Sequence, residues 1–244
     1  MEFGLDNLRL KDISTQSAAD RVTVDSALAL LAGLLPPTGD QVWSTSNYNA
    51  DELARLWQPV AVSTVEAQRD WKLSTEAACR TAELVENVTI TENVPELRHF
   101  LAANREVIRR LEVLTGEDFT GDLSWIWIAN LYDTYISEAE YFGPAFYPPR
   151  WADEQTLAVL RQANELKFSV WGHDQAYLRL RGGPLLQEIT DNLIRAAKDE
   201  AGGRSLAIYS TFDTNIAIIE HSLGIFRGNW TEMMMMIYCL MSTT

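Results

Sequence analysis

Residues 204–224, RSLAIYSTFDTNIAIIEHSLG, predict a buried strand that leads through a short polar turn directly into a helix. The run from Leu206 to Tyr209 is apolar and has the length of a strand. Beyond the turn, apolar side chains recur at helical spacing, at Ile216, Ile219, Leu223 and Phe226. A strand followed by a helix leaves unpaired N–H groups at the carboxyl edge of the sheet, where open α/β sheets bind anionic ligands. We therefore expect a ligand site at this corner.

Asp213 lies at this corner and fits two roles. Aspartate is a favoured N-cap residue, and here it stands at the start of the predicted helix. The other role is in the ligand site itself, because Asp213 lies at the edge where open α/β sheets bind their ligands. On local grounds the neighbouring Phe212 is an apolar anchor in the core. The choice between the two roles of Asp213 depends on the rest of the chain.

The composition is that of an acidic globular protein. Its 244 residues suffice for one large domain or for one domain with a substantial insertion. The net charge of −14 and the pI near 4.6 exclude nucleic acid and an anionic membrane surface as partners, since both attract cationic proteins. No apolar run approaches the roughly 20 residues that span a bilayer. The N-terminus, MEFGLDNLRLKD, does not have the pattern of a signal peptide, so we expect neither a membrane span nor a secretion signal.

No metal or cofactor is expected. The three histidines, His99, His173 and His221, are scattered, and no ligand spacing typical of a metal site occurs. Cys79 and Cys239 lie far apart in the sequence and fit either two free thiols or one disulfide.

The N-terminal part predicts an α/β unit. Residues 5–13 alternate as in a short strand, and the polar residues 14–20 that follow predict a loop. Apolar positions at helical spacing then predict a helix from Arg21 to Leu35, which two prolines end. A short helix at residues 51–57 and a strand at residues 57–62 follow.

The middle of the chain is predicted to be helical. The expected helices are a long one at 95–111, then 123–136, 152–168 and one from 183 onward, with a proline-rich break at 141–151. Consecutive helices without a strand between them suggest a helical cap inserted into an α/β domain. The expected domains are an α/β core at residues 1–78 and 151–228, a helical cap at 79–150, and an irregular tail at 229–244.

Several segments, in order along the chain, resemble one family. They are RVTVDSA at 21–27, LLAGLLPP at 30–37, LWQPVAV at 56–62, CR at 79–80, LYDT at 131–134, RGGPLL at 181–186 and IYSTFDT at 208–214. Together they resemble the histidine acid phosphatases, especially their animal lysosomal and secreted branch, over most of residues 10–226. The combination is far more specific than any single segment.

The resemblance implies a phosphoglycerate-mutase-like α/β sheet with flanking helices and a helical cap insertion. It also implies hydrolysis of phosphate monoesters through a phosphohistidine. Such chemistry needs an imidazole that attacks phosphorus, arginines that hold the phosphate, a second histidine, and a carboxylic acid that protonates the leaving group. By resemblance Asp213 is that acid. Arg21, which on local grounds could equally be a solvated residue of a first helical turn, becomes a phosphate-binding residue.

Two features depart from the family pattern. The family's nucleophile lies in an Arg-His-Gly-x-Arg motif on its first strand, and this motif does not occur among the 244 residues. We therefore expect the first strand, and the nucleophile with it, to be missing. The family's His-Asp motif is here Phe212-Asp213. Phenylalanine donates no hydrogen bond and carries no charge, and losing one such donor slows catalysis by about 100- to 1,000-fold.

These departures leave two hypotheses. In the first, the chain is a degenerate relative that binds a small phosphate ester or another small ligand without turnover. In the second, it is an incomplete translation of an active acid phosphatase, which in this family is lysosomal or secreted. Phe212 favours the first hypothesis. A homodimer is implied by the resemblance alone, and loss of a central strand predicts a chain that is marginally stable or aggregates.

Overall fold

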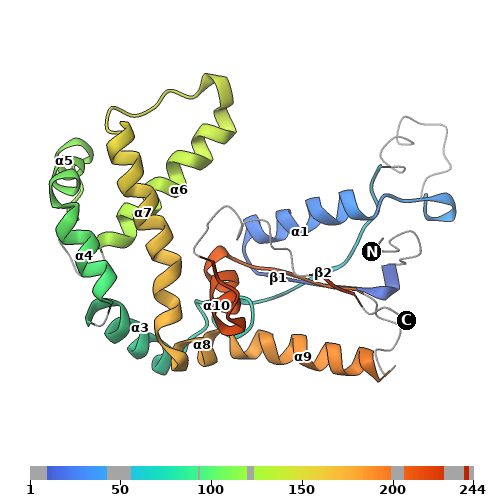
Figure 1. Ribbon diagram of the computed structural model, residues 1–244. Coiled ribbons are helices and arrows are strands. Elements are labelled where there is room, and N and C mark those ends of the chain that lie inside the picture. The colour runs from blue at the N-terminus through green and yellow to red at the C-terminus, as the bar shows by residue number, and fades with distance from the viewer. Residues whose placement is uncertain are drawn as a thin grey trace. The chain divides into compact units, whose positions relative to one another are not determined.

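The computed structural model describes residues 10–42, 56–92, 94–119, 124–198, 206–227 and 239–241. It is an α/β structure, mostly helical with a small, mainly parallel sheet, so the predicted fold class is confirmed (Figure 1). The chain forms two compact units. The first comprises Met1–Ala78, Arg181–Ile216 and Met236–Thr244, and the second comprises Cys79–Leu180 and Ala217–Met235. These units do not coincide with the domains expected from the sequence, and that division stays a prediction.

The sheet belongs to the first unit and has the strand order β2-β1-β3-β4. Its strands are β1 Ile13–Ala18, β2 Val62–Val65, β3 Leu206–Ser210 and β4 Cys239–Met241. The inner strand β1 is parallel to both β2 and β3, whereas β4 is antiparallel to β3. The register pairs Ala18 with Val65 and Ser17 with Ser210. The three parallel strands therefore end at one side of the sheet, which we call the carboxyl edge.

The prediction of a loop at residues 14–20 is wrong, because most of this segment forms β1. The predicted strand at residues 5–13 overlaps β1 only at Ile13, and residues 5–9 lie outside the described part of the chain. Thr15, Ser17 and Ala18 are buried although two of them are polar. Backbone pairing on both sides of β1 outweighs the weak strand preference of its side chains. No gap separates β1 from β2 or β3, and the expected loss of a first strand stays a prediction.

The prediction of a strand at residues 57–62 is also displaced, since β2 begins only at Val62. The preceding segment contains Pro59, which has no N–H to donate to a neighbouring strand. Gln58 is buried, and its Nε2 donates to the carbonyl of Leu35 at 3.0 Å. This contact holds the segment against the end of a helix instead of in the sheet. The helix predicted at 51–57 lies largely outside the described residues.

Two helices cover opposite faces of the sheet in the first unit (Figure 1). They are α1 Arg21–Leu34 and α9 Gly183–Ala197, and the shorter helical turns are η2 Leu10–Asp12, η3 Gly39–Gln41 and η4 Ala67–Arg69. The face toward α1 is apolar and packs Leu31 and Leu35 on Leu206 and Ile208. Burial of such a cluster is the main favourable term in folding.

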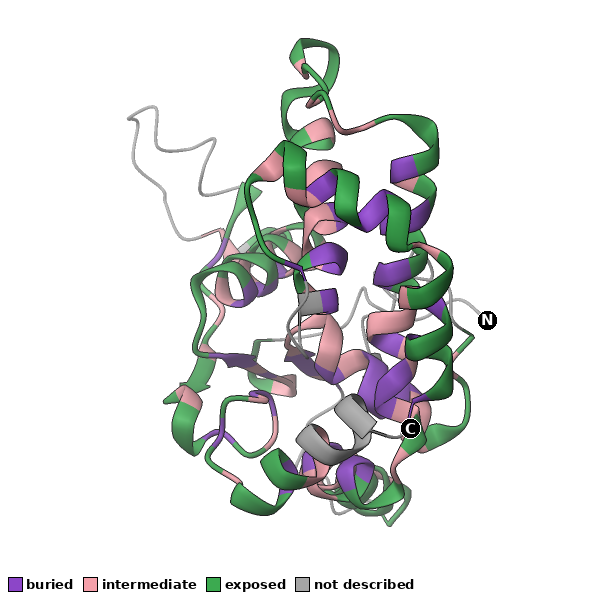
Figure 2. Cartoon of the chain, turned by 90° about the vertical axis from the view of Figure 1, so that its left-hand side faces the viewer, coloured by how far each residue is buried: buried purple, intermediate pink, exposed green. Residues whose placement is uncertain are grey.

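The second unit is helical. It contains α3 Arg80–Glu92, α4 Pro95–Ala103, α5 Arg105–Thr115, α6 Ser124–Phe142, η5 Gly143–Ala145, α7 Glu154–Ser169, η6 Val170–His173, α8 Gln175–Arg181 up to Leu180, and α10 Asp213–Leu223 from Ala217 on. Buried positions alternate with exposed ones along these helices, as expected where each helix buries one face (Figure 2). The buried side chains form two clusters, centred on Leu111 and Leu160 and on Trp125 and Ile218.

The long helix predicted at residues 95–111 is two helices that meet at Asn104. The backbone N–H of Asn104 closes α4 on the carbonyl of Phe100 at 3.0 Å, and its Nδ2 donates to the same carbonyl at 3.0 Å. An asparagine side chain that bonds the local backbone in this way competes with helix continuation. The helix predicted from Ile216 through Phe226 ends at Leu223, where Gly224 has a φ of +69°.

Candidate functional site

Three loops lie at the carboxyl edge of the sheet in the first unit. Residues 19–20 join β1 to α1, residues 66–79 follow β2, and residues 211–212 join β3 to α10. Because β1, β2 and β3 are parallel and in register, the side chains on these loops gather at one edge. Open α/β sheets bind their ligands at this kind of edge. Residues 21–27 and 208–214, the first and the last of the segments that resemble the family, therefore both reach this edge.

Asp213 is the first residue of α10, directly after β3. Its Oδ1 accepts hydrogen bonds from the N–H of Thr214 at 2.6 Å and from the hydroxyl of Thr214 at 3.3 Å. The carbonyl of Phe212 accepts the first helical bond, from the N–H of Ile216 at 3.1 Å. Phe212 is therefore the N-cap residue, and the N-cap role considered for Asp213 is wrong. A carboxylate in the first turn interacts favourably with the helix dipole.

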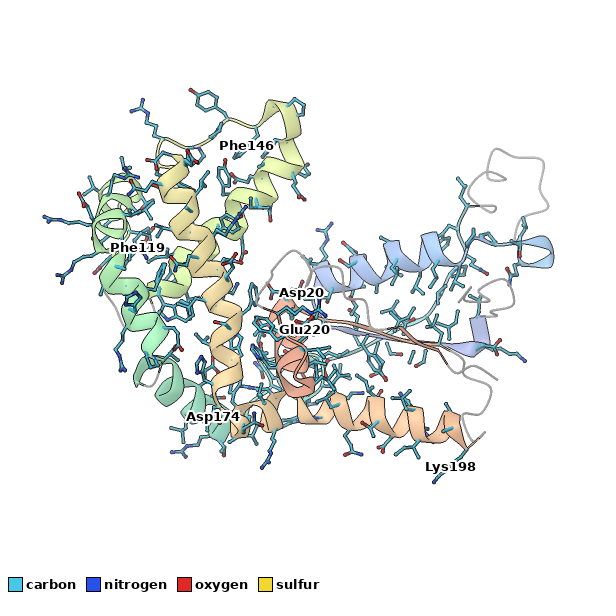
Figure 3. All side chains as sticks on the ribbon, viewed as in Figure 1. Asp20, Phe119, Phe146, Asp174, Lys198 and Glu220 are labelled. Atoms are coloured by element: carbon cyan, nitrogen blue, oxygen red, sulfur yellow. The ribbon has the colours of Figure 1, made fainter. Side chains whose placement is uncertain are left out.

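Arg21 is the first residue of α1. It directly follows Asp20, which Figure 3 labels at the start of this helix. Asp20 is the N-cap residue of α1, since its Oδ1 accepts from the N–H of Val22 at 2.8 Å. The side chain of Arg21 is 93% exposed, and its Nε lies 3.4 Å from Oδ2 of Asp25. Arg21 thus pairs with Asp25 and not with Asp213. An exposed pair of this kind contributes about 0–1 kcal/mol to stability and is easily exchanged for another anion.

Two hydroxyl groups hold the corner that carries Phe212 and Asp213. Oγ of Ser210 donates to the carbonyl of Thr23 in the first turn of α1 at 2.8 Å. Oγ1 of Thr211 donates to the carbonyl of Leu73 in the loop after β2 at 2.7 Å. The corner is therefore tied to both neighbouring loops of the carboxyl edge. From the sequence alone these residues are expected only to form a short polar turn, and nothing in the local sequence indicates their partners.

Asp70 is a buried carboxylate in the loop after β2 that sequence reasoning did not single out. It is 2% exposed, and its Oδ1 accepts from the N–H groups of Lys72 at 3.1 Å and Leu73 at 2.9 Å. These two bonds form a tight turn, residues 70–73. In the sequence DWKL, Asp70 stands two residues before Lys72, the first of its two N–H donors, which is a common turn signal. This signal could have suggested the turn but not the burial of Asp70.

His221 lies in the second unit. Its Nε2 lies 3.0 Å from the carbonyl of Phe168, which identifies Nε2 as the protonated nitrogen of the neutral ring. Burial lowers the pKa of His221, although the hydrogen bond to Phe168 opposes this shift. Among the described residues no group of three or more His, Cys, Asp or Glu side chains is arranged to hold a metal ion. Cys79 is a free thiol, and none of the described helices is both long and apolar enough to cross a membrane.

Comparison with known proteins gives consistent matches. The model of the histidine phosphatase superfamily (branch 2) matches residues 4–240. Prostatic acid phosphatase of Bos taurus is 32% identical over 211 residues, which cover 84% of this chain and 50% of the relative. Lysosomal acid phosphatase of Bos taurus is 32% identical over 210 residues, covering 84% and 46%, and prostatic acid phosphatase of Homo sapiens is 30% identical over 211 residues, covering 84% and 50%. The chain therefore spans about half the length of these relatives.

Proposed function

The chain belongs to the histidine phosphatase superfamily (branch 2), and on this premise we propose that it binds a small phosphate ester, or a related small ligand, without hydrolysing it. The ligand lies at the carboxyl edge of the first unit, against the loop that joins β3 to α10. Asp213 is the remnant of the family's general acid, and Arg21 is the cation that meets the phosphate group.

Phe212 is the observation that carries this proposal. The residue precedes Asp213 at the carboxyl end of β3, where the family's motif has a histidine. An imidazole there would donate a hydrogen bond to the phosphate, and removal of one such donor slows catalysis by about 100- to 1,000-fold. Apolar surface next to the carboxyl group of Asp213 suits an apolar or amine-bearing ligand better than it suits phosphate alone.

Arg21 can serve the ligand after a small rearrangement. Its partner Asp25 is itself 62% exposed, so the pair that has to be exchanged is weak. A phosphate offers two oxygens to the planar guanidinium, which is a stronger arrangement than the single contact with Asp25. Arg21 also stands at the N-terminus of α1, where the helix dipole favours an anion.

Titration of the protein with inorganic phosphate, followed by amide signals in NMR spectra, tests the binding. We expect the signals of Arg21 and of residues 211–214 to shift together with one dissociation constant. Arg21→Ala should weaken the binding, whereas Asp25→Ala, which frees Arg21, should leave it unchanged or strengthen it. Equal binding by the parent protein and Arg21→Ala would contradict the role given to Arg21. Absence of shifts at residues 211–214 at millimolar phosphate would contradict the site.

A second candidate function is that of a segment of an active acid phosphatase. The observation that favours it is that the chain spans about half the length of its relatives. Coding sequence upstream that contains Arg-His-Gly, and turnover by the longer product, would support this candidate. Phe212 counts against it, because it lies within a segment that otherwise matches the family well.

A homodimer is proposed from the family alone, and sedimentation equilibrium would test it.

A further inference from the structure

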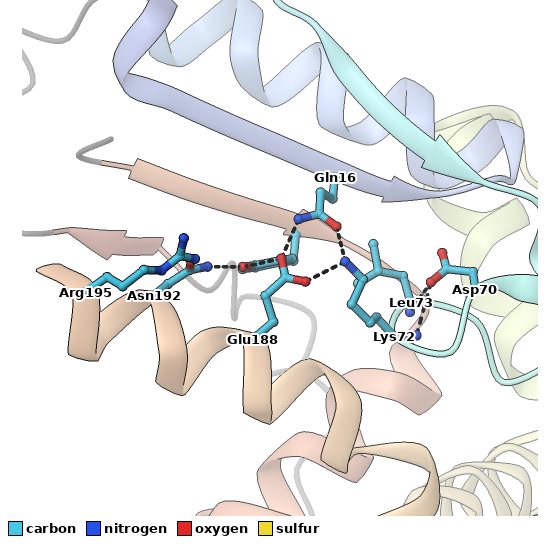
Figure 4. A network of polar contacts seen from close by, with 8 residues as sticks. Gln16, Asp70, Lys72, Leu73, Glu188, Asn192 and Arg195 are labelled. Carbon is cyan, nitrogen blue, oxygen red and sulfur yellow. Dashed lines mark hydrogen bonds and ion pairs between the residues drawn. The ribbon is translucent and has the colours of Figure 1, made fainter. Parts of the chain in front are cut away.

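A network of polar side chains lies between the sheet and α9 in the first unit (Figure 4). Nζ of Lys72, on the loop after β2, donates to Oε2 of Glu188 on α9 at 2.5 Å and to Oε1 of Gln16 on β1 at 2.6 Å. Oε1 of Glu188 accepts from Nε2 of Gln16 at 2.5 Å and from the hydroxyl of Tyr209 on β3 at 3.1 Å. Nδ2 of Asn192 in turn donates to the hydroxyl of Tyr209 at 2.7 Å. One carboxylate therefore joins two strands, a loop and a helix.

Glu188 is held in its charged form by these contacts. Burial by itself would raise its pKa, but the hydrogen bonds from Lys72 and Gln16 and the charge of Lys72 outweigh burial, so the pKa of Glu188 lies below its usual value. Burial and the neighbouring charge of Glu188 raise the pKa of Tyr209, which remains a neutral donor. The side chains of Lys72 and Glu188 are 29% and 25% exposed, which places this pair between a surface pair and a buried one.

The network reaches the candidate site through consecutive contacts. Lys72 is part of the turn 70–73, which Asp70 closes by accepting two N–H groups. Leu73, the next residue, is 2% exposed, and its carbonyl accepts the hydroxyl of Thr211 at 2.7 Å. Thr211 directly precedes Phe212 and Asp213. The side chain of Glu188 is thus connected to the corner by one ion pair, one turn and one hydrogen bond.

We infer that Glu188 is a positioning residue for the ligand site at the carboxyl edge. Through Lys72 it fixes the turn 70–73, and this turn fixes Thr211 and the backbone that carries Phe212 and Asp213. The proposed function supplies one part of this inference, namely that a ligand binds beside Phe212 and Asp213. An apolar contact between α9 and the sheet would bury surface equally well, but it would not direct a loop. The hydrogen bonds from Nζ of Lys72 to Gln16 and Glu188 are directional, so they hold the Lys72 side chain in one conformation.

The observed contacts also separate this role from general stabilisation. Gln16 and Tyr209 bridge Glu188 to strands that already pair with each other, whereas its contact with Lys72 reaches the loop after β2. Loss of the charge on Glu188 therefore acts on that loop more than on the sheet. Apart from Gln16 and Tyr209, which contact Glu188 directly, its effects should appear at residues 211–213 and not at the opposite end of the sheet, where Ile13 pairs with Leu206.

The substitution Glu188→Gln tests the inference, with Asp191→Asn as the matched control. Asp191 lies on the same helix and is exposed. Its Oδ1 accepts from Nε2 of Gln187 at 2.9 Å and its carbonyl accepts from Nε of Arg195 at 3.4 Å, both within α9. Both variants lose one carboxylate charge. We expect the amide signals of Thr211, Phe212 and Asp213 to shift in Glu188→Gln and to stay in place in Asp191→Asn. The signals of Ile13 and Leu206, at the opposite end of the sheet, should stay in place in both.

Titration of the same variants with inorganic phosphate measures the functional effect. Coupling through a connected network amounts to roughly 3- to 30-fold in affinity, and we expect Glu188→Gln to weaken phosphate binding within this range. Lys72→Met, which removes the other half of the ion pair and keeps an unbranched side chain, should produce the same shifts. It serves as the test if Glu188→Gln does not fold.

The outcomes for the inference and for the proposed function are distinguishable. If the parent protein does not bind phosphate, the proposed function fails for this ligand, and the shifts at residues 211–213 alone judge the role of Glu188. If these signals stay in place in both Glu188→Gln and Lys72→Met, the inference is overturned whether or not phosphate binds. Signals that shift equally throughout the sheet in Glu188→Gln would likewise overturn it, because they would indicate general stabilisation.

Discussion

The substitution Gly172→Ala should strongly destabilise the second unit. A Cβ atom at residue 172 would lie 2.3 Å from Nδ1 and 2.5 Å from Cε1 of His221. The imidazole cannot easily move away, because it stacks on Phe226 with ring centroids 3.9 Å apart and bonds the carbonyl of Phe168 at 3.0 Å. Either the ring leaves both partners or the backbone of η6 shifts.

The size of the effect follows from these contacts. Forcing an extra carbon into a packed site costs about 1–3 kcal/mol, and loss of a hydrogen bond costs about 0.5–1.5 kcal/mol. We therefore expect Gly172→Ala to lower the free energy of unfolding by about 2–4 kcal/mol. Urea denaturation followed by circular dichroism measures this change as a lower midpoint at unchanged slope.

Gly33→Ala is the matched control for that substitution. No atom lies within 4 Å of a Cβ at residue 33, which is inside α1. Alanine is the better helix former, so this variant should gain up to about 1 kcal/mol. In a His221→Ala background, Gly172→Ala should cost less than about 1 kcal/mol, since the clash is gone. An unchanged midpoint for Gly172→Ala, or the same loss with and without His221, would refute the reasoning.

Three further predictions concern pH dependence, burial and capping. Burial lowers the pKa of His221 in the folded state below the value of 6.5 that it has in the unfolded chain, so the stability linked to this residue is complete above pH 6.5 and is lost as pH falls below it. His221→Gln should flatten this part of a profile of melting temperature against pH. An unchanged profile would contradict the assignment. Thr15 is 3% exposed, and its Oγ1 has no hydrogen-bond partner among the residues that the structure describes. Thr15→Val should therefore raise the free energy of unfolding by about 1 kcal/mol in urea titrations, and a loss would show that the hydroxyl is satisfied. Asp20→Ala removes the N-cap bond of α1 and should cost about 0.5–2 kcal/mol by the same measurement, whereas an Asp25→Ala variant with an equal loss would point to charge instead of capping.

The corner between β3 and α10 could be predicted from the sequence because both halves carry local signals. Leu206 to Tyr209 form an apolar run of strand length, and the apolar residues after Asp213 recur at helical spacing. The end of the helix at Leu223 was harder to place, since Phe226 continues the apolar pattern beyond Gly224.

The strand β1 could not be predicted, because its stability comes from partners that are distant in sequence. Ile13 pairs with Leu206, and Thr15 pairs with Val62 as well as with Ile208. A polar segment between two strands is satisfied by backbone bonds on both sides, and no local pattern reports this. The apolar residues nearby favoured an earlier strand at residues 5–13.

The candidate site was only partly predictable for the same reason. The resemblance indicated Arg21, Phe212 and Asp213, and the structure places all three at the carboxyl edge. Lys72 and Glu188 are 116 residues apart, and nothing in either local sequence indicates that they form an ion pair. Contacts at such separations depend on the topology of the sheet and not on local spacing.

Steady-state hydrolysis of a chromogenic phosphate monoester at acidic pH tests the central claim most directly. We expect the 244-residue chain to release product no faster than a protein-free blank, because the proposed function has Phe212 at the position of the family's phosphate-stabilising imidazole. We also expect no difference between the parent protein, Arg21→Ala and Asp213→Asn. Turnover above the blank that either substitution abolishes would contradict the account.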